Sequence, residues 1–455
     1  MVSSAFAVLS LVSAAAAEFH VVRHVSHTPR ALEPAVIPPA EFVVPITSTA
    51  PRRQSKKTNL ASLRKKLSPT GNTAVLEGAD LDQEYLTDVT IGGQTFTAIV
   101  DTGSSDTWLI KKNFRCFNLT GFPEDTETCG FGSEGFDTAA SPTFKNFPNV
   151  SFNISYGDGE FLSGPVGFDT VSVGGLAVTQ QEIGTPDFAA WNGDGVNSGL
   201  IGLAYASLTS VFNTTDPTKA SRANHIPYDP FFFTAVKRGA VKNPFFSLAL
   251  NRGPLLVNVT EDKNLGFLAF GGMPPVALDD KTAVTVPVQG YSATDGNPTS
   301  APDPNAVFFY YTADVEGYTF PGSTKLNTKN NNTILDSGTT LNYLPSAVAE
   351  AYNAQFVPKA TFDEESGLYF VDCKAKVPPF SVKLGGKSFP IDARDQILLG
   401  GTDDDGKPIC ISGTQSGGED TPENVFILGD VFLHNVVSTF DIKANEMTVT
   451  RRKKY

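Results

Sequence analysis

The sequence predicts an all-β protein with two lobes and a few short helices. Gly, Ser, Thr, Val and Phe are frequent, turn-forming residues recur every ten or so positions, and long amphipathic helical periods are scarce. Once a leader is set aside, about 390 residues remain, more than one compact core usually holds. A motif that occurs twice, far apart in the chain, completes the prediction because it indicates an internal duplication.

The first copy of this motif ends an apolar strand with an aspartate. Apolar β-branched residues suit a buried strand, and a glycine after the aspartate allows a turn that a Cβ would forbid. By itself such an aspartate is as readily an Asx-turn or a helix N-cap. The residues are Ile99, Val100, Asp101, Thr102, Gly103, Ser104 and Ser105, with Trp108 just behind them.

The second copy repeats the same order of apolar residues, aspartate, hydroxyl residue, glycine and hydroxyl residues. It runs Thr333, Ile334, Leu335, Asp336, Ser337, Gly338, Thr339 and Thr340, and its aspartate lies 235 positions after Asp101. About a hundred residues later each copy is followed by an apolar-apolar-Gly step, at 200–202 and at 427–429. Two copies of the motif, each followed at a similar distance by an apolar-apolar-Gly step, predict a duplicated fold.

The chain begins with two segments that differ from the rest. Residues 1–17 are apolar and Ala-rich and predict a signal peptide, although no Lys or Arg stands near the start; a short buried helix is the alternative. Residues 18–66 carry nine Lys or Arg and three acids, against 26 basic and 45 acidic residues in the remainder. We expect a basic propeptide over an acidic cleft, ending as late as about residue 76, with a disordered linker as the alternative. The pairs Arg52-Arg53 and Lys65-Lys66 are candidate cleavage points.

The rest of the chain divides into two predicted lobes, residues 77–270 and 271–455, each with one copy of the motif. One hairpin is clear, because residues 150–156 alternate apolar and polar, Gly157, Asp158 and Gly159 form a turn, and 160–162 return. Short helices are expected at 230–237 and 345–356, and the basic residues 451–455 are expected to form a solvated tail.

Four cysteines follow the leader, and a secretory leader implies an oxidising compartment, so two disulfides are expected. Of the three possible pairings we favour the one that stays within each repeat, Cys116 with Cys129 and Cys373 with Cys410. A zinc site is disfavoured because no CxxC or Cys/His cluster exists. The candidate N-glycosylation sites are Asn118, Asn149, Asn213 and Asn258, while Asn153 and Asn331 lie too close to the motif strands.

Several reaction classes are excluded by what the chain lacks. Beyond the leader only His225 and His434 remain, and no motif supports either as the base of a Ser or Cys nucleophile. No spacing suggests a metal site or a phosphate loop, and the acidic body disfavours nucleic acid. No later run is long and apolar enough for a membrane span, and no C-terminal lipid-anchor signal is found. We therefore expect no cofactor, metal, nucleic-acid partner or membrane anchor.

Paired carboxylates are the chemistry that remains. If the two halves pack about a pseudo-twofold axis, Asp101 and Asp336 face each other across the interface. Two carboxyls that close cannot both ionise cheaply, so the pair would share one proton at acid pH. One carboxyl could then act as a base for a bound water and the other as an acid toward a carbonyl.

From about Tyr85 onward the chain resembles the pepsin-like aspartic endopeptidases and is most similar to the secreted fungal ones. The matching segments are 100–105 with Trp108, 155–159, 199–203, 335–340 and 426–432, and they cover both lobes. The resemblance implies a bilobal double β-barrel with a cleft between the lobes and a hairpin flap over it. It also implies acid cleavage of peptide bonds, usually between bulky apolar residues, and a zymogen inhibited by its propeptide. We expect a secreted monomer, with an acidic vacuole as the alternative destination.

Under this resemblance Asp101 and Asp336 are the catalytic pair. Thr102 and Ser337 would bond across the lobes, and Ser104 and Thr339 would bond the outer carboxylate oxygens; ordinary turn capping is the alternative for these hydroxyls. The remaining expected site residues complete the turns, form the flap or line the pocket before the cut: Gly103, Gly338, Tyr156, Gly157, Trp108, Ile99 and Leu200. For Tyr156 and Trp108 the alternative is a place in the aromatic core.

Asp158 concerns specificity. Some fungal members carry an acid here and accept Lys before the scissile bond, because a carboxylate can pair with an ammonium in a partly desolvated pocket. The alternative is that Asp158 only favours the tight turn before Gly159.

Two rivals remain. A non-catalytic pepsin-fold protein could bind a partner in the cleft, but such proteins usually lack an Asp or the flap tyrosine, which are present here. A two-carboxylate glycosidase rarely places its acids on duplicated Asp-Thr/Ser-Gly turns.

Overall fold

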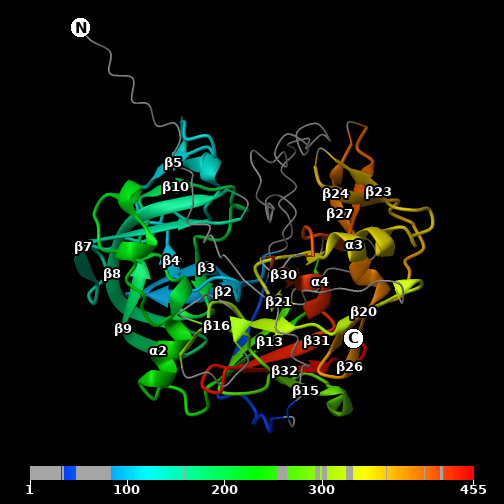
Figure 1. Cartoon of the computed structure of the whole chain (residues 1–455). Helices are drawn as coiled ribbons and strands as arrows, with labels where there is room; N and C mark the ends of the chain where they lie inside the picture. The colour runs from blue at the N-terminus through cyan, green and yellow to red at the C-terminus, as the bar shows by residue number, and fades with distance from the viewer. Residues whose placement is uncertain are drawn as a thin grey trace.

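The computed structural model describes residues 32, 35–47, 84–157, 159–253, 264–292, 298–299, 305–323, 332–364, 366–403, 405–420 and 424–455. These residues form two β-rich lobes that stand side by side, with a further sheet below and between them (Figure 1). The predicted all-β, two-lobed fold is thus confirmed.

The first lobe is built on one eleven-stranded sheet whose strands fold back on one another. Its long hairpin of β7 and β8 is the predicted one, although β7 begins five residues earlier than expected. The strands are β2 (Leu86–Ile91), β3 (Gln94–Asp101), β4 (Thr107–Leu109), β5 (Arg115–Phe117), β6 (Pro123–Glu124), β7 (Lys145–Ser155), β8 (Phe161–Val173), β9 (Leu176–Gly184), β10 (Phe188–Ala190), β11 (Gly199–Gly202) and β12 (Val211–Phe212).

The second lobe has four smaller sheets. The five-stranded one is β19 (Thr312–Asp314), β21 (Asn332–Leu335), β30 (Phe426–Leu428), β22 (Asn342–Leu344) and β29 (Thr414–Ser416). The four-stranded one is β23 (Thr361–Asp363), β24 (Leu368–Val371), β28 (Pro408–Ser412) and β27 (Ile397–Thr402). The two three-stranded ones are β20 (Gly317–Thr319), β25 (Phe380–Leu384) and β26 (Lys387–Ile391), and β17 (Pro298–Thr299), β16 (Gly290–Ser292) and β18 (Ala306–Val307).

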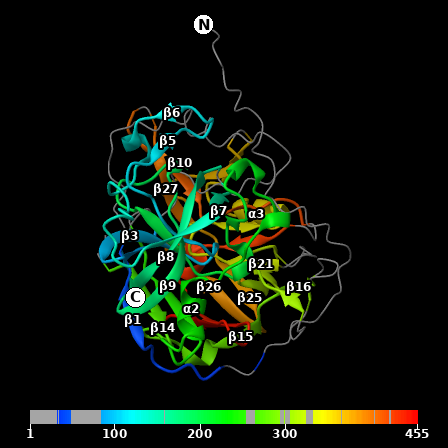
Figure 2. The same cartoon turned by 90° about the vertical axis from the view of Figure 1, so that its left-hand side faces the viewer.

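A six-stranded sheet joins the lobes. Its strands, in spatial order, come from the start, middle and end of the chain: β1 (Phe42–Pro45), β14 (Gly266–Phe270), β13 (Phe245–Leu250), β31 (Val436–Asp441), β32 (Glu446–Arg451) and β15 (Val284–Pro287). Figure 2 shows β1 beside β14 at the edge of this sheet. Strand β1 belongs to the predicted propeptide, and its Val44, together with the following Ile46, is buried in the main core.

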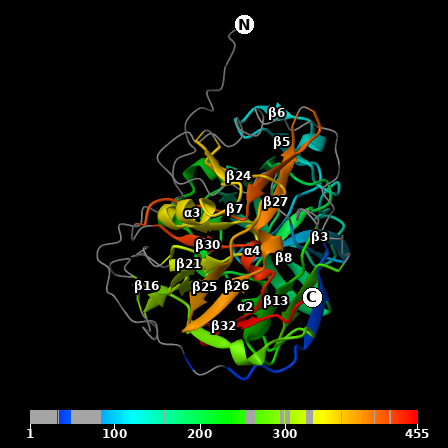
Figure 3. The same ribbon diagram turned by 90° about the vertical axis from the view of Figure 1, so that its right-hand side faces the viewer.

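Helices are short in the described part of the chain. The α-helices are α2 (Phe231–Lys237), α3 (Ser346–Asn353) and α4 (Asp430–Leu433), and the first two lie within the predicted ranges, although α3 ends three residues earlier than expected. The 3-10 helices are η1 (Thr126–Cys129), η2 (Ala206–Leu208), η3 (Pro217–Lys219), η4 (Arg222–Asn224), η5 (Asp280–Thr282) and η7 (Ala393–Gln396). Figure 3 shows α4 near the six-stranded sheet, well inside the molecule. No described helix is long and apolar enough to cross a membrane.

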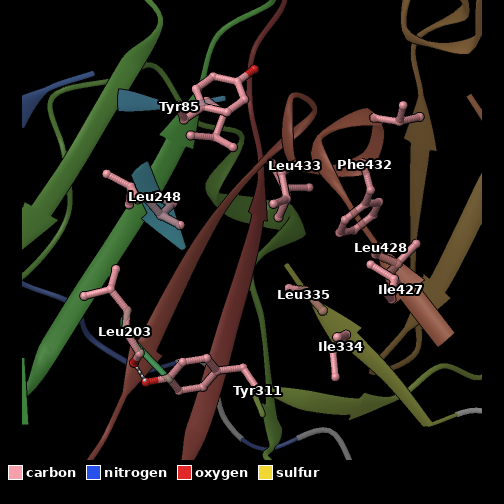
Figure 4. Packing of buried hydrophobic residues seen from close by; sticks show 14 of the residues in the cluster. Tyr85, Leu203, Leu248, Tyr311, Ile334, Leu335, Ile427, Leu428, Phe432 and Leu433 are labelled. Atoms are coloured by element: carbon pink, nitrogen blue, oxygen red, sulfur yellow. Dashed lines mark hydrogen bonds between the residues drawn. The ribbon is translucent and has the colours of Figure 1, made fainter. Parts of the chain in front are cut away.

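One hydrophobic core runs through both lobes and the sheet that joins them. Figure 4 shows its junction, where the Tyr311 hydroxyl donates a 2.7 Å hydrogen bond to the Leu203 carbonyl across the lobe boundary. A second, smaller core lies in the first lobe and contains Trp108, Phe152 and Trp191. The strands that carry the two aspartates therefore end at a packed junction.

The prediction of a solvated C-terminal tail holds only in part: Lys453, Lys454 and Tyr455 are exposed, but Arg451 ends β32 and Arg452 is partly buried. The Arg452 guanidinium donates to the Leu250 carbonyl and to Asn251 Oδ1, and it lies over the Tyr455 ring at 3.8 Å. The Arg252 guanidinium also lies over the Tyr455 ring, at 4.7 Å, and the Tyr455 hydroxyl donates to the His434 carbonyl at 2.8 Å. The positive charge of residues 451–455 favours solvation, but Tyr455 supplies an apolar ring on which guanidinium groups stack.

Candidate active site

Asp101 is the last residue of β3. This strand pairs in parallel with β11, so that Leu200 lies opposite Ile99 and Gly202 opposite Asp101. The Gly103 amide donates to Asp101 Oδ1 at 2.6 Å, and the Ser104 hydroxyl donates to Asp101 Oδ2. The distal Gly step noticed in the sequence is therefore the strand that supports the first aspartate.

Asp336 repeats this arrangement in the second lobe. It directly follows β21, which pairs in parallel with β30, the strand formed by the second distal step. The Gly338 amide donates to Asp336 Oδ1 at 2.9 Å, and the Thr339 hydroxyl donates to Asp336 Oδ2 at 2.7 Å. Each carboxylate is thus held by one backbone amide and one hydroxyl at the end of a buried strand.

The two carboxylates meet where the lobes join. A Cβ placed on Gly103 would lie 2.5 Å from Asp336 Oδ1, and one placed on Gly338 would lie 2.5 Å from Asp101 Oδ1. Only glycine at both positions leaves room for the opposite carboxylate, because real Cβ atoms do not approach that closely. Asp101 and Asp336 are 6% and 7% exposed, so both are nearly withdrawn from water.

Burial raises the pKa of both carboxyls above the ordinary value. For Asp101 the repulsion from Asp336 raises the pKa further, while the bonds from Ser104 and Gly103 lower it. Neighbouring carboxyls in a low-dielectric site are more stable with one proton between them than with two negative charges. The pair can therefore hold one acid and one base side by side.

Four hydrogen bonds between Thr102 and Ser337 and the opposite loops lock the two turns together. The Thr102 hydroxyl donates to the Leu335 carbonyl at 2.9 Å and accepts from the Ser337 amide at 3.0 Å. The Ser337 hydroxyl donates to the Val100 carbonyl at 2.9 Å and accepts from the Thr102 amide at 3.2 Å. All of these groups are buried, so the loops are fixed relative to each other.

Tyr156 lies in the turn between β7 and β8. Its hydroxyl accepts a 2.8 Å hydrogen bond from Trp108 Nε1, which comes from β4. The Tyr156 ring meets the Trp191 ring edge-on at 5.7 Å, and Trp191 meets Trp108 edge-on at 5.4 Å. The sequence suggested Trp108 and Tyr156 but missed Trp191, which belongs to no short motif and follows β10 in an irregular segment.

The other predicted site residues are placed as follows. Ile99 and Leu200 are neighbours across β3 and β11 and are 7% and 4% exposed. Gly157 follows Tyr156 in the turn, whereas Asp158 and Asn258 lie outside the described residues. Asn149 and Asn213 are exposed, and Asn118 is partly buried, with its side-chain amide donating to Glu124.

Two disulfides connect Cys116 to Cys129 and Cys373 to Cys410, the favoured pairs. The first encloses β5, β6 and η1 beside the Tyr156 turn, and Cys116 and Cys129 are buried with Trp108 and Trp191 in the smaller core. The second links the β24 side of the four-stranded sheet to β28.

Comparison with known proteins agrees with this geometry. The family model described as eukaryotic aspartyl protease matches residues 84–451. A probable aspartic-type endopeptidase of Aspergillus fumigatus is 37% identical over 372 residues, 80% of this chain and 77% of that protein. Penicillopepsin-1 of Penicillium janthinellum is 29% identical over 366 residues, 79% and 92% of the two chains. The crystal structure of the aspartic proteinase from Irpex lacteus aligns with a TM-score of 0.59 at 19% identity, covering 90% of this chain and 97% of that one.

Proposed function

Since this chain belongs to the eukaryotic aspartyl protease family and is an aspartic endopeptidase, we propose that Asp101 and Asp336 together hydrolyse its peptide substrates. The observation that carries this proposal is the approach of each carboxylate to the glycine of the opposite turn. The two carboxyls are buried and have raised pKa values, which supports a pair that shares one proton and acts together on one substrate carbonyl and one water.

The reaction follows from the shared proton. The ionised carboxyl removes a proton from a water molecule, whose oxygen bonds to the scissile carbonyl carbon. The protonated carboxyl gives its proton to the carbonyl oxygen, which forms a tetrahedral diol. When the carbon–nitrogen bond breaks, the leaving nitrogen takes up a proton and the diol returns to a carboxylic acid. No cofactor is required by this sequence of steps.

The surroundings of the pair support apolar substrates. Ile99, Leu200 and Trp191 lie next to the strand ends and the Tyr156 turn, and all are apolar and nearly buried. We propose that bulky apolar side chains are bound here before the cleaved bond. Acceptance of Lys through Asp158 remains a separate proposal: Asp158→Ser should abolish cleavage after Lys and keep cleavage after Phe, and unchanged Lys cleavage would refute it.

We also propose that the chain is a zymogen that is secreted. The leader strand β1 is part of the folded protein, and the Ile46 amide and carbonyl are paired with Gly266 and Leu265. Thr47 exchanges two hydrogen bonds with Leu86. Cleavage at Arg52-Arg53 or Lys65-Lys66 would fall between these anchored segments. That the leader inhibits the enzyme stays a prediction, because most of the leader lies outside the described residues.

The test is hydrolysis of denatured haemoglobin from acid to neutral pH after acid incubation of the precursor, with and without pepstatin. Pepstatin resembles the tetrahedral intermediate and therefore reports on the carboxyl pair. We expect activity that peaks at acid pH, is blocked by pepstatin and disappears in Asp101→Asn and in Asp336→Asn. Full activity in either variant would overturn the assignment.

A further inference from the structure

Building on the proposed function, we propose that Glu160 is a positioning residue that latches the flap to the first lobe. The flap is the turn between β7 and β8, in which Tyr156, Gly157, Gly159 and Glu160 are described. The latch is the hydrogen bond that the Asn192 amide donates to Glu160 Oε1 at 2.7 Å. By fixing the flap against this segment, it holds Tyr156 in the place where substrate is bound.

The position of Glu160 in the sheet explains why a side chain is needed here. Strands β8 and β10 are antiparallel, and their described pairing reaches Phe161 opposite Ala190. At the next position the Glu160 carbonyl accepts from the Tyr156 amide at 2.9 Å, on the β7 side, and the described β8–β10 pairing goes no further than Phe161 and Ala190. The Glu160 carboxylate extends the connection past the end of the ladder by binding the next available amide, that of Asn192.

The latch acts on Tyr156 through Trp191, the residue just before Asn192. The Trp191 ring packs edge-on against both Tyr156 and Trp108, and Trp108 binds the Tyr156 hydroxyl. Trp191 Nε1 is buried and has no hydrogen-bond partner among the described residues. The indole is therefore positioned by packing and by its backbone, and Glu160 binds that backbone one residue further on, at the Asn192 amide.

The other side of this segment is rigid. The Gly193 amide donates to the Cys129 carbonyl at 3.0 Å, and the Gly195 amide donates to the Gly130 carbonyl at 2.6 Å. A Cβ on Gly130 would lie 2.3 Å from the Gly193 carbonyl oxygen, so the two backbones are in direct contact. The Cys116–Cys129 disulfide closes this loop. Glu160 thus connects the turn that covers the site to a disulfide-bound anchor.

The bond is shielded from water on the Glu160 side, so its loss should be measurable. Glu160 is 6% exposed, whereas Asn192 is exposed and the hydrogen bond between them is partly buried. Without the Glu160 acceptor the Asn192 amide is left to water, and its hydrogen exchange should become faster. Removing the acceptor should free the flap without touching the Asp101 and Asp336 loops.

The experiment compares Glu160→Ala, Glu160→Gln and the parent in the mature enzyme. Hydrogen exchange of the Asn192 amide, followed in fragments that span residues 188–197, should be faster by roughly ten-fold or more in Glu160→Ala. With a quenched-fluorescence octapeptide that carries Leu and Phe at the cleaved bond, KM should rise roughly ten-fold while kcat stays within about two-fold. Glu160→Gln keeps a side-chain carbonyl and should restore both values to near those of the parent.

Glu124→Ala is the matched control. It removes a carboxylate of the same lobe that accepts an N–H, from Asn118 at 3.0 Å, in an exposed hairpin. Its KM should equal that of the parent. Parent-like exchange and KM in Glu160→Ala would overturn the latch, and so would a Gln variant as impaired as the Ala variant. The exchange measurement needs no catalysis, so it separates failure of the latch from failure of the proposed function.

Discussion

Thr102 and Ser337 each place a hydroxyl on the strand that leads into the other's turn. The acceptors are the carbonyls of Leu335 and Val100, which directly precede Asp336 and Asp101. Because every bond of this set is buried, the relative position of Asp101 and Asp336 does not depend on solvent-exposed contacts. The spacing of the carboxyl pair is therefore a property of the junction between the lobes.

Loss of either hydroxyl should impair catalysis more than stability alone would explain. In Thr102→Val or Ser337→Ala a buried carbonyl and amide lose their partner, which costs about 1–3 kcal/mol of unfolding free energy. The misplaced carboxyls should lower kcat/KM by roughly a hundred-fold. The measurements are urea unfolding and peptide kinetics. Because each hydroxyl accepts from the backbone amide of the other residue, the two substitutions are coupled, and the double variant should lose less than the sum of both losses.

Ser105→Ala provides the control for that experiment. Its hydroxyl is also buried in the first turn but bonds within the same region, to the Tyr205 carbonyl at 2.6 Å. It should lose stability with a much smaller change in kcat/KM. An equal loss of kcat/KM in Ser105→Ala would contradict a specific role for the bonds that cross between the lobes.

Asp106 should make the first lobe less stable as the pH rises. Burial raises its pKa to about 6, although bonds from Tyr228 and Ser210 lower it. A raised pKa means that the folded state holds the proton, so this contribution is present below about pH 4 and is lost as the pH rises through 6. Its size is about 3 kcal/mol. Asp106→Asn should flatten the unfolding free energy over this range in urea titrations at several pH values.

Asp216→Asn is the control for the pH experiment. The Asp216 carboxyl is exposed, and its pKa is lowered by Thr218 and Lys219. Its replacement should leave the fall toward neutral pH in place. If Asp106→Asn retained the parent's full dependence on pH, Asp106 would not be its source.

The buried ion pair between Arg252 and Asp395 should stay formed at acid pH. Arg252 binds both carboxylate oxygens at 2.7 Å, and Asp395 is fully buried. Burial alone would raise the Asp395 pKa, but His434 and Arg252 bring it below the ordinary value. A lowered pKa keeps the contribution above the unfolded pKa and loses it only as the pH falls through the folded one.

Asp395→Ala should therefore lower the unfolding free energy by about 3–5 kcal/mol at acid pH, because it removes the buried partner of Arg252 and leaves only Asp392, 3.9 Å away and partly exposed. Denaturant unfolding measures this loss. The exposed pair of Lys219 and Asp216, 3.3 Å apart, is the comparison, and Lys219→Ala should cost less than about 1 kcal/mol. A loss of similar size in both variants would contradict the buried role.

The terminal residue should contribute to stability. Tyr455→Ala removes a ring that contacts two guanidinium groups and a hydroxyl bonded to the His434 carbonyl, so the unfolding free energy should fall by about 1–2 kcal/mol. Tyr455→Phe should retain the stacking part of this contribution. Lys454→Ala, in the exposed neighbour, should change stability by less than about 0.5 kcal/mol, and thermal unfolding distinguishes the three.

The two-lobed β fold and the two aspartate turns could be predicted from the sequence because both depend on short patterns that occur twice. Asp101 and Asp336 stand in matching motifs, and their supporting strands recur at matching distances. Hairpin β7–β8 was visible because a strand shows a period of two residues and its turn is rich in glycine.

Other features had no local pattern. Glu160 and Asn192 are 32 positions apart, and nothing in either neighbourhood marks a bond between a side chain and an amide. Arg252, Asp395 and His434 come from three separate regions and meet only when the lobes pack. Tyr455 was hidden in a basic run whose net charge favoured solvation. Such contacts are consequences of tertiary packing, which periodicity and composition do not encode.

The six-stranded sheet has a consequence for biosynthesis. It places β1, from the first tenth of the chain, and β31 and β32, from the last residues, in one hydrogen-bonded layer. Strand β31 is synthesised long after β13, so β13 has no partner on one side until β31 has left the ribosome. Until then its open edge can pair with other nascent chains. Folding of the two lobes can be completed only after β31 and β32 have been made, and the slow step should be the closing of this long-range sheet.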